Sequence, residues 1–203
     1  MSQYFEVHPT HPQHRLLSRA ADILRRGGVI AYPTDTTYAI GWHLEDKSAL
    51  ERVQKLRRLD KRHLMTLVCK DLSEIATYAR VDNSQYRTLK AYTPGPFTFV
   101  LRANRDVPRR VVHPKRKTIG IRVPDHAIVH GLLEALGEPM MSTTLHLPGQ
   151  PLPMTDPLDI REQLEQRLDL VLDGGHCGVE PTTLVDLTTD VPEVLRQGTG
   201  ELA

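Results

Sequence analysis

The stretch with the clearest chemical potential is a run of hydroxyl-bearing residues after a short apolar segment. Pro33-Thr34-Asp35-Thr36-Thr37-Tyr38 follows residues 29–32, which lack polar alternation and are predicted to form a strand buried on both faces. Because ligands of open α/β sheets bind beyond the carboxyl ends of strands, this turn is a predicted binding site. Its hydroxyls and carboxylate can orient a polar substrate without reacting. An ordinary turn explains the same residues about as well, since Thr and Asp are common there.

Two groups of cations offer an anion-binding surface. Arg57, Arg58, Lys61, Arg62 and His63 lie at the end of a predicted helix, where positive charge also complements the helix dipole without any ligand. Residues 102–117 carry seven Lys and Arg residues and one acidic residue. Guanidinium groups bind phosphate through paired hydrogen bonds. A solvated helix end and a solvated loop remain the simpler interpretations. No aromatic residues interleave with the loop to stack bases.

Neither a metal site nor a covalent nucleophile is predicted. Two sets of closely spaced histidines lack a cysteine pair or an H-E-x-x-H pattern and are interpreted as surface or core residues: His8, His11 and His14, and His126 with His130. Cys69 and Cys177 lie outside any nucleophile context. The glycine patterns of P-loop and dinucleotide-binding proteins are absent.

Helix and strand patterns alternate along the chain. Apolar residues at three-to-four spacing predict helices over residues 12–26, 46–58, 73–79, 84–92, 127–137 and 158–168. Short apolar runs predict strands over residues 29–32, 64–69, 97–101, 117–123, 140–145, 170–172, 183–186 and 194–197, with an edge strand near residues 4–7. Connections of mixed length favour an α/β (α+β) domain with a mixed sheet. Residues 148–157 form the one candidate hinge, which is short for a domain linker.

Composition sets the outer limits on function. The chain has 203 residues, of which 39% are hydrophobic and 25% charged, and this excludes a disordered protein. No apolar run reaches the roughly 18 residues of a membrane helix, and no secretory pattern opens the sequence, so we expect a cytoplasmic protein without a membrane partner. The net charge of +1 hides a division. Residues 150–203 hold three basic and eleven acidic residues, a charge of −8, while the first 149 hold 23 and 14, a charge of +9. That asymmetry permits an anionic ligand on the larger part.

Six segments in order give a resemblance to a known family. They are PTDTTYAIG, PGPFTFVL, TIGIRVPDH, MSTTLHLPG, GVEPTTLVDL and LRQGTG. Together they resemble the YrdC/YciO family from about residue 12 to residue 200, and the variants PTD and PTT are most similar to its YciO branch. The resemblance implies the YrdC-like (YrdC/RibB) fold, an open, twisted, mixed parallel/antiparallel sheet with flanking helices. It implies one domain over residues 1–203, with a core of about residues 12–200.

The activity implied by the resemblance is that of a threonylcarbamoyl-AMP synthase. Such enzymes condense L-threonine, bicarbonate and ATP into threonylcarbamoyl-adenylate, which serves N6-threonylcarbamoylation of adenosine 37 in tRNA. ATP is a substrate, Mg²⁺ is expected with the nucleotide, and no structural metal is implied. The alternative is a protein of the YciO type that binds double-stranded RNA or tRNA without robust synthesis. A related transfer to another amine is also open.

The resemblance also assigns residues by position. Thr36, Arg122 and Thr182 fall where the family contacts threonine, and the nucleotide positions are Arg57, His63, Thr118, Ser142, Thr144 and Arg196. Thr34, Asp35, Tyr38 and Thr183 would support them. No covalent nucleophile is needed, because a carbamate oxygen attacks the α-phosphate and the protein positions the reactants and neutralises charge.

Two steps depart from the family pattern. Its K-x-R-P step is read here as Arg57-Arg58-Leu59-Asp60, which replaces its lysine by arginine and its arginine by leucine. Its S-A-N step is Ser142-Thr143-Thr144. Losing one phosphate cation would cost several kcal/mol of transition-state binding, for which Arg58, Lys61 or Arg62 could compensate. Weak or altered synthase activity is therefore part of the hypothesis.

Overall fold

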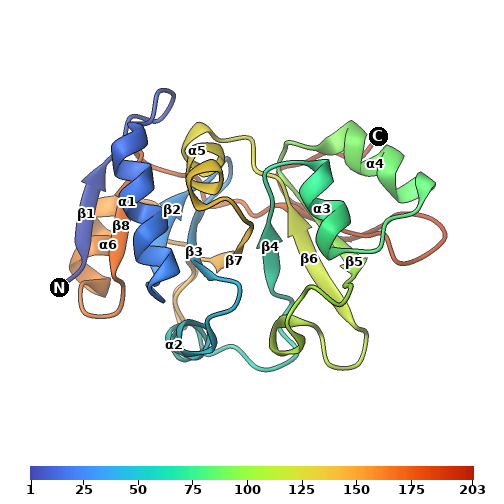
Figure 1. The fold of residues 1–203 in the computed structure, drawn as a ribbon, viewed down its shortest axis with the longest axis horizontal. Helices are drawn as coiled ribbons and strands as arrows, with labels where there is room; N and C mark the ends of the chain where they lie inside the picture. Colours follow the sequence, from blue (N-terminus) through green and yellow to red (C-terminus); the bar gives the residue numbers. More distant parts are fainter.

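The chain forms one ten-stranded mixed sheet with helices on both faces (Figure 1). The computed structural model describes residues 1–203. In chain order the strands are β1 (Gln3–Glu6), β2 (Ile30–Pro33), β3 (Tyr38–His43), β4 (Thr66–Val68), β5 (Phe97–Arg102), β6 (Thr118–Arg122), β7 (Met140–Thr144), β8 (Leu170–Asp173), β9 (Thr183–Asp186) and β10 (Glu193–Arg196). The spatial order is β1-β8-β2-β3-β7-β4-β6-β5-β9-β10.

The sheet contains both parallel and antiparallel strand pairs. β1 and β2 run parallel to β8, β4 is parallel to β6, and β5 is parallel to β9. The other neighbours are antiparallel: β2 with β3, β3 and β4 with β7, β5 with β6, and β9 with β10. This confirms the predicted fold class. The strands that follow residues 148–157 pair with strands near both ends of the sheet. β8 lies between β1 and β2, and β9 pairs with β5.

Four of the six α-helices begin at an aspartate that caps them. They are α1 (His14–Arg25), α2 (Lys47–Arg57), α3 (Leu72–Tyr78), α4 (Asn83–Tyr92), α5 (Ala127–Leu136) and α6 (Pro157–Leu164), with a short 3-10 helix η1 (Arg109–Val111). The carboxylates of Asp46, Asp71, Asp82 and Asp156 each accept a hydrogen bond from a first-turn N–H of α2, α3, α4 and α6. None of these helices is both long and apolar enough to cross a bilayer.

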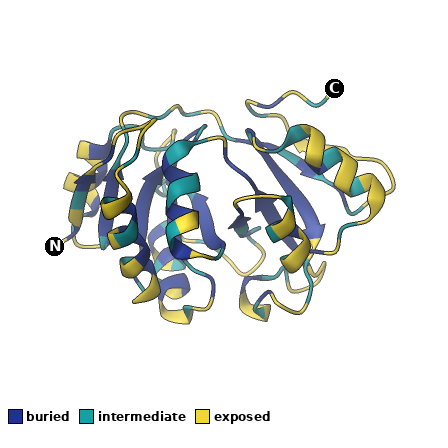
Figure 2. Ribbon diagram, turned by 45° about the horizontal axis from the view of Figure 1, so that its top comes forward, coloured by how far each residue is buried: buried dark blue, intermediate teal, exposed yellow.

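Each sheet face has its own hydrophobic core. Helices α1 and α5 pack on one face over residues such as Ile30, Tyr32 and Met140. Helices α2, α3, α4 and α6 contribute to the larger core on the other face, around Trp42 and Phe99. The strands are consequently buried almost throughout, and the helices expose only their outer sides (Figure 2). The exceptions are the two edge strands: β1 buries only Phe5, and all four residues of β10 are exposed.

Predicted and observed elements differ mainly around the hydroxyl-rich segment. Its last residue, Tyr38, begins a strand, β3, that the sequence pattern did not predict. Its residues Tyr38–Gly41 are buried with no polar alternation, and it pairs antiparallel with β2 as a hairpin. A buried strand shows no period-two signal, so only pairing reveals it. The predicted helix over residues 158–168 ends earlier, at Leu164.

Candidate functional site

A polar cleft of about 200 Å³ opens on the sheet face that carries α1 and α5, beyond the cover of those helices. Ser142, Thr66 and Gly120 are register partners on β7, β4 and β6, so they point to the same face. Gly120 has no side chain to fill the floor of the cleft. A Cβ at this position would lie only 3.1 Å from Thr66 Oγ1. The lining comprises Ala39, Arg57, His63, Leu64, Thr66, Thr98, Arg122, Ser142, Thr143, Thr144, Thr182, Leu184 and Arg196. The lining contains three arginines and no carboxylate.

The turn between β2 and β3 is organised by one hydroxyl. Thr34 Oγ1 accepts the backbone N–H groups of Thr36 and Thr37, at 3.1 and 3.2 Å, and donates to the carbonyl of Thr37 at 2.6 Å. A threonine side chain that replaces backbone partners in this way fixes a turn. The result is that Asp35 and Thr36 are held in fixed positions at the end of β2.

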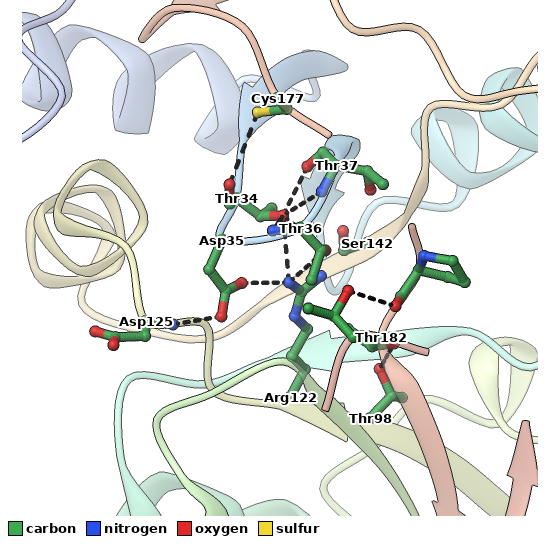
Figure 3. A network of polar contacts seen from close by, with 12 residues as sticks. Thr34, Asp35, Thr36, Thr37, Thr98, Arg122, Asp125, Ser142, Cys177 and Thr182 are labelled. Carbon is green, nitrogen blue, oxygen red and sulfur yellow. Dashed lines mark hydrogen bonds and ion pairs between the residues drawn. The ribbon is translucent and has the colours of Figure 1, made fainter. Parts of the chain in front are cut away.

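Arg122 connects that turn to the cleft. Its Nη2 donates to Thr34 Oγ1 at 3.2 Å, to Thr36 Oγ1 at 2.9 Å and to the carboxylate of Asp35 (Figure 3). The other carboxylate oxygen of Asp35 accepts the N–H of Asp125 at 3.0 Å. Arg122 is 8% exposed, and its buried Nε has no hydrogen-bond partner. One edge of a buried guanidinium is thus anchored while its Nε still lacks an acceptor.

Arg196 enters from the opposite side of the cleft. Its Nε and Nη2 both donate to the carbonyl of Thr182, at 3.3 and 3.0 Å. The hydroxyl of Thr182 lies 2.8 Å from that of Thr98 on β5. A register shift between Val194 and Arg196 breaks the pairing of β10 with β9. Partial desolvation and the nearby charge of Arg122 lower the pKa of Arg196, as expected where cations gather without carboxylates.

Arg57 and His63 form the third side of the cleft. Arg57 is the last residue of α2, and its Nη1 donates to the carbonyl of His146 at 2.6 Å while its buried Nε has no partner. His63 Nε2 lies 3.3 Å from Thr143 Oγ1. Burial lowers the pKa of Arg57, and burial together with the charge of Arg57 lowers the pKa of His63. Positive charge therefore accumulates at the end of the cleft.

Ser142 is held from below by a residue that the sequence pattern did not single out. The hydroxyls of Ser142 and the fully buried Tyr32 lie 2.5 Å apart. The Tyr32 ring reaches Ser142 across Gly41, where a Cβ would lie 3.0 Å from Tyr32 Cε1. Burial raises the pKa of Tyr32 to about 12, so the phenol keeps its proton. No local signal could reveal this contact, since Tyr32 reads as an apolar strand residue.

Most of the predicted site residues converge on this cleft. Arg57, His63, Arg122, Ser142, Thr144, Thr182 and Arg196 line it, and Thr34, Asp35 and Thr36 reach it through Arg122. Three predicted residues lie elsewhere. Thr118 lines a neighbouring cavity with Arg102 and Arg116. Tyr38 donates to the carbonyl of Gly175 at 2.7 Å, and Thr183 donates to that of Gly200 at 2.6 Å, so both hydroxyls fix backbone segments.

The cations expected to compensate for a lost charge do not reach the cleft. Arg58, Lys61 and Arg62 are exposed and outside its lining, because Arg58 is the left-handed C-cap that turns the chain away from α2. Leu59, read as the position of the family arginine, is also outside the lining. Arg57 faces the cleft instead. A K-x-R pattern can also be read two residues earlier, as Lys55-Leu56-Arg57, but Lys55 is exposed and outside the lining, so only Arg57 of this pattern reaches the cleft.

His126 and His130 do not lie on one helix face, because His126 precedes α5 and His130 lies within it. His126 is the N-cap of α5, and its Nδ1 accepts the N–H of Ile128 at 3.2 Å. No three His, Cys, Asp or Glu side chains gather in a metal-binding arrangement. Cys177 donates to the carbonyl of Thr34 over 3.7 Å, and burial raises its pKa to about 11. Cys177 therefore keeps its proton and contacts the turn as a hydrogen-bond donor.

The structure is thus an α/β protein with a mixed sheet and a cleft lined by arginines and hydroxyls, and sequence comparison places it among known proteins. The chain belongs to the Sua5/YciO/YrdC family, whose model, described as "Telomere recombination", matches residues 22–198. It is similar to YciO of Escherichia coli K12, with 52% identity over 100% of this chain and 98% of the relative.

Two further comparisons extend this relation. The crystal structure of E. coli YciO superposes with a TM-score of 0.96 over 99% of this chain and 98% of that one. The threonylcarbamoyl-AMP synthase of Photobacterium profundum is 30% identical over 90% of this chain and 98% of its own length. Sua5 of P. abyssi in complex with L-threonine has the same fold, with a TM-score of 0.88 at 24% identity, over 97% of this chain and 58% of that one.

Proposed function

We propose that this protein condenses L-threonine, bicarbonate and ATP into threonylcarbamoyl-adenylate and pyrophosphate, a precursor for modification of adenosine 37 in tRNA. The observation that carries the proposal is the convergence of Arg57, Arg122 and Arg196 on one cleft whose lining has no carboxylate. Relatives 30% identical to this chain are threonylcarbamoyl-AMP synthases, and a Sua5 structure holds L-threonine.

The amino acid would bind at the Arg122 end. Nη2 is already occupied by Asp35, Thr34 and Thr36, and Nε is enclosed, so a ligand carboxylate would meet Nη1 of the guanidinium. A hydrogen bond between a guanidinium and a carboxylate contributes more than an ordinary hydrogen bond. The anchored edge keeps the guanidinium plane from turning, which is the preorganisation that positioning catalysis needs.

The nucleotide would bind toward Arg57, His63 and Arg196. In the reaction the amino group combines with bicarbonate to give a carbamate and water. A carbamate oxygen then attacks the α-phosphorus, and pyrophosphate leaves. Because the protein supplies no nucleophile, the cations act by neutralising charge on the phosphates. Mg²⁺ would arrive on the phosphate oxygens, since no lining residue is Asp or Glu. It would neutralise further charge on the leaving group.

Pyrophosphate release tests this proposal. With ATP, L-threonine and bicarbonate together, we expect threonine-dependent pyrophosphate and an adenylate product. Arg122→Gln should raise the threonine KM most, while the control Arg87→Gln, an exposed residue on α4, should leave the kinetics unchanged. Absence of threonine-dependent pyrophosphate, together with no thermal shift on adding ATP, would refute the assignment.

Binding of duplex RNA is a second candidate, favoured by the exposed cations of residues 102–117. Arg102, Arg105, Arg109, Arg110, Lys115, Arg116 and Lys117 are all exposed, and of these only Arg110 pairs with a carboxylate, that of Glu45. A surface that contacts phosphates loses affinity steeply with salt. Replacing Lys115 and Arg116 by Gln should flatten the salt dependence, whereas Arg122→Gln should not. No binding at low salt would exclude this role.

A further inference from the structure

His63 is the one ionisable residue of the cleft lining whose charge can change near neutral pH. Arg57, Arg122 and Arg196 stay charged, whereas an imidazole titrates close to physiological pH. We propose that His63 takes up a proton when a phosphate-like polyanion enters the cleft, and that this uptake makes His63 a specificity-determining residue for ligands with high local negative charge. This inference rests on the proposed function, because it concerns the phosphate end of the same cleft.

The surroundings of His63 keep the ring neutral in the free protein. Arg57 from α2 and Arg196 from β10 act on it as positive charges, and Asp60 of its own loop acts in the opposite sense. From β7 it faces only the Thr143 hydroxyl, and it has no carboxylate partner, unlike His43, which contacts Glu138, and His176, which contacts Asp156. Burial is the largest effect lowering the pKa of His63.

A bound polyanion reverses this balance. Its charge would neutralise Arg57 and Arg196, the two groups that oppose protonation, and would add a direct attraction for an imidazolium. The pKa of His63 in the complex must then rise above that in the free protein. By linkage, ligand binding gains strength in full below the free-state pKa and loses that gain as the pH rises through the bound-state pKa. A singly charged carboxylate held at Arg122 would not produce the effect.

Sulfate is the appropriate probe, because it is a dianion that does not titrate in the range where histidine does. NMR of the imidazole protons of the full chain should show a His63 pKa below the ordinary value, rising on saturation with sulfate. The sulfate Kd should rise by up to about tenfold for each unit of increasing pH between the free-state and the bound-state pKa of His63. His63→Gln, which also assigns the resonance, should bind sulfate more weakly at low pH, with a Kd independent of pH.

Two further variants keep the test decisive. His14→Gln removes an exposed histidine on α1 and should retain the full pH dependence of the wild-type protein. Arg57→Gln should raise the His63 pKa in the free protein, because it removes one of the opposing charges. A wild-type Kd that does not change with pH, or a pH dependence that survives in His63→Gln, would overturn the His63 inference alone. Absence of saturable sulfate binding at every pH would overturn both this inference and the proposed phosphate site.

Discussion

The ion pair between Asp35 and Arg122 should contribute strongly to stability as well as to the site. The two side chains are only 13% and 10% exposed. Removing one partner of a buried pair strands the other charge, which costs about 3–5 kcal/mol. Asp35→Ala also loses the hydrogen bond from the N–H of Asp125, worth about 1 kcal/mol. Because Arg122 faces an open cleft that admits water, we expect the lower half of the range, about 3–4 kcal/mol.

Chemical denaturation with urea measures this effect. Asp35→Asn should cost less, roughly 1.5–3 kcal/mol, since it keeps one acceptor but loses the charge. In the double variant Asp35→Ala/Arg122→Met no buried charge remains, so its destabilisation should fall short of the sum of the single variants by at least about 1 kcal/mol. Glu51→Ala is the control. Its pair with Lys47 is exposed on α2, and its loss should change the stability by less than about 0.5 kcal/mol.

The reasoning would be refuted if Asp35→Ala unfolded within about 1 kcal/mol of the wild-type protein at an unchanged m-value. That result would mean that water in the cleft already solvates Arg122 in the native state. Arg122 would then need no protein counter-ion, and the argument for a preorganised guanidinium would fail with it.

Three further predictions concern the floor of the cleft and its supporting turn. Tyr32→Phe removes the hydroxyl 2.5 Å from Ser142 and should cost about 1 kcal/mol in thermal or urea unfolding, because Ser142 can still use water in the cleft; a cost above about 3 kcal/mol would show that water does not replace the phenol. Gly41→Ala places a Cβ 3.0 Å from Tyr32 Cε1 and 3.2 Å from Met140 Sδ, so it should destabilise the fold by about 1–3 kcal/mol, and an unchanged midpoint would contradict the close approach. The pKa of Cys177, raised to about 11, leaves roughly one thiol in a thousand ionised at pH 8. Its reaction with a disulfide reagent should therefore be slow and should accelerate as the pH rises, whereas a rate equal to that of a free thiol would disprove the shift.

Much of the fold could be predicted from local pattern. The helices that carry an apolar stripe, such as α1 and α2, lie close to their predicted limits, because the three-to-four spacing of apolar residues is a local property. The strand β3 escaped prediction because burial on both faces removes alternation. The insertion of β8 between β1 and β2 had no local signal either, since Leu170 pairs with Gln3 and Ile30, which are 167 and 140 residues away in the chain.

The candidate site, like the fold, could be predicted only in part. The family, the hydroxyl-rich turn after a buried strand and the positively charged residues could all be identified from the amino-acid sequence. The meeting of Arg57, Arg122 and Arg196 in one cleft, with Arg58, Lys61 and Arg62 facing solvent, became evident from the folded chain alone. The reason is physical. Residue type fixes what a side chain can do, but its direction depends on sheet register and on helix termini, which are set by packing between segments distant in the chain.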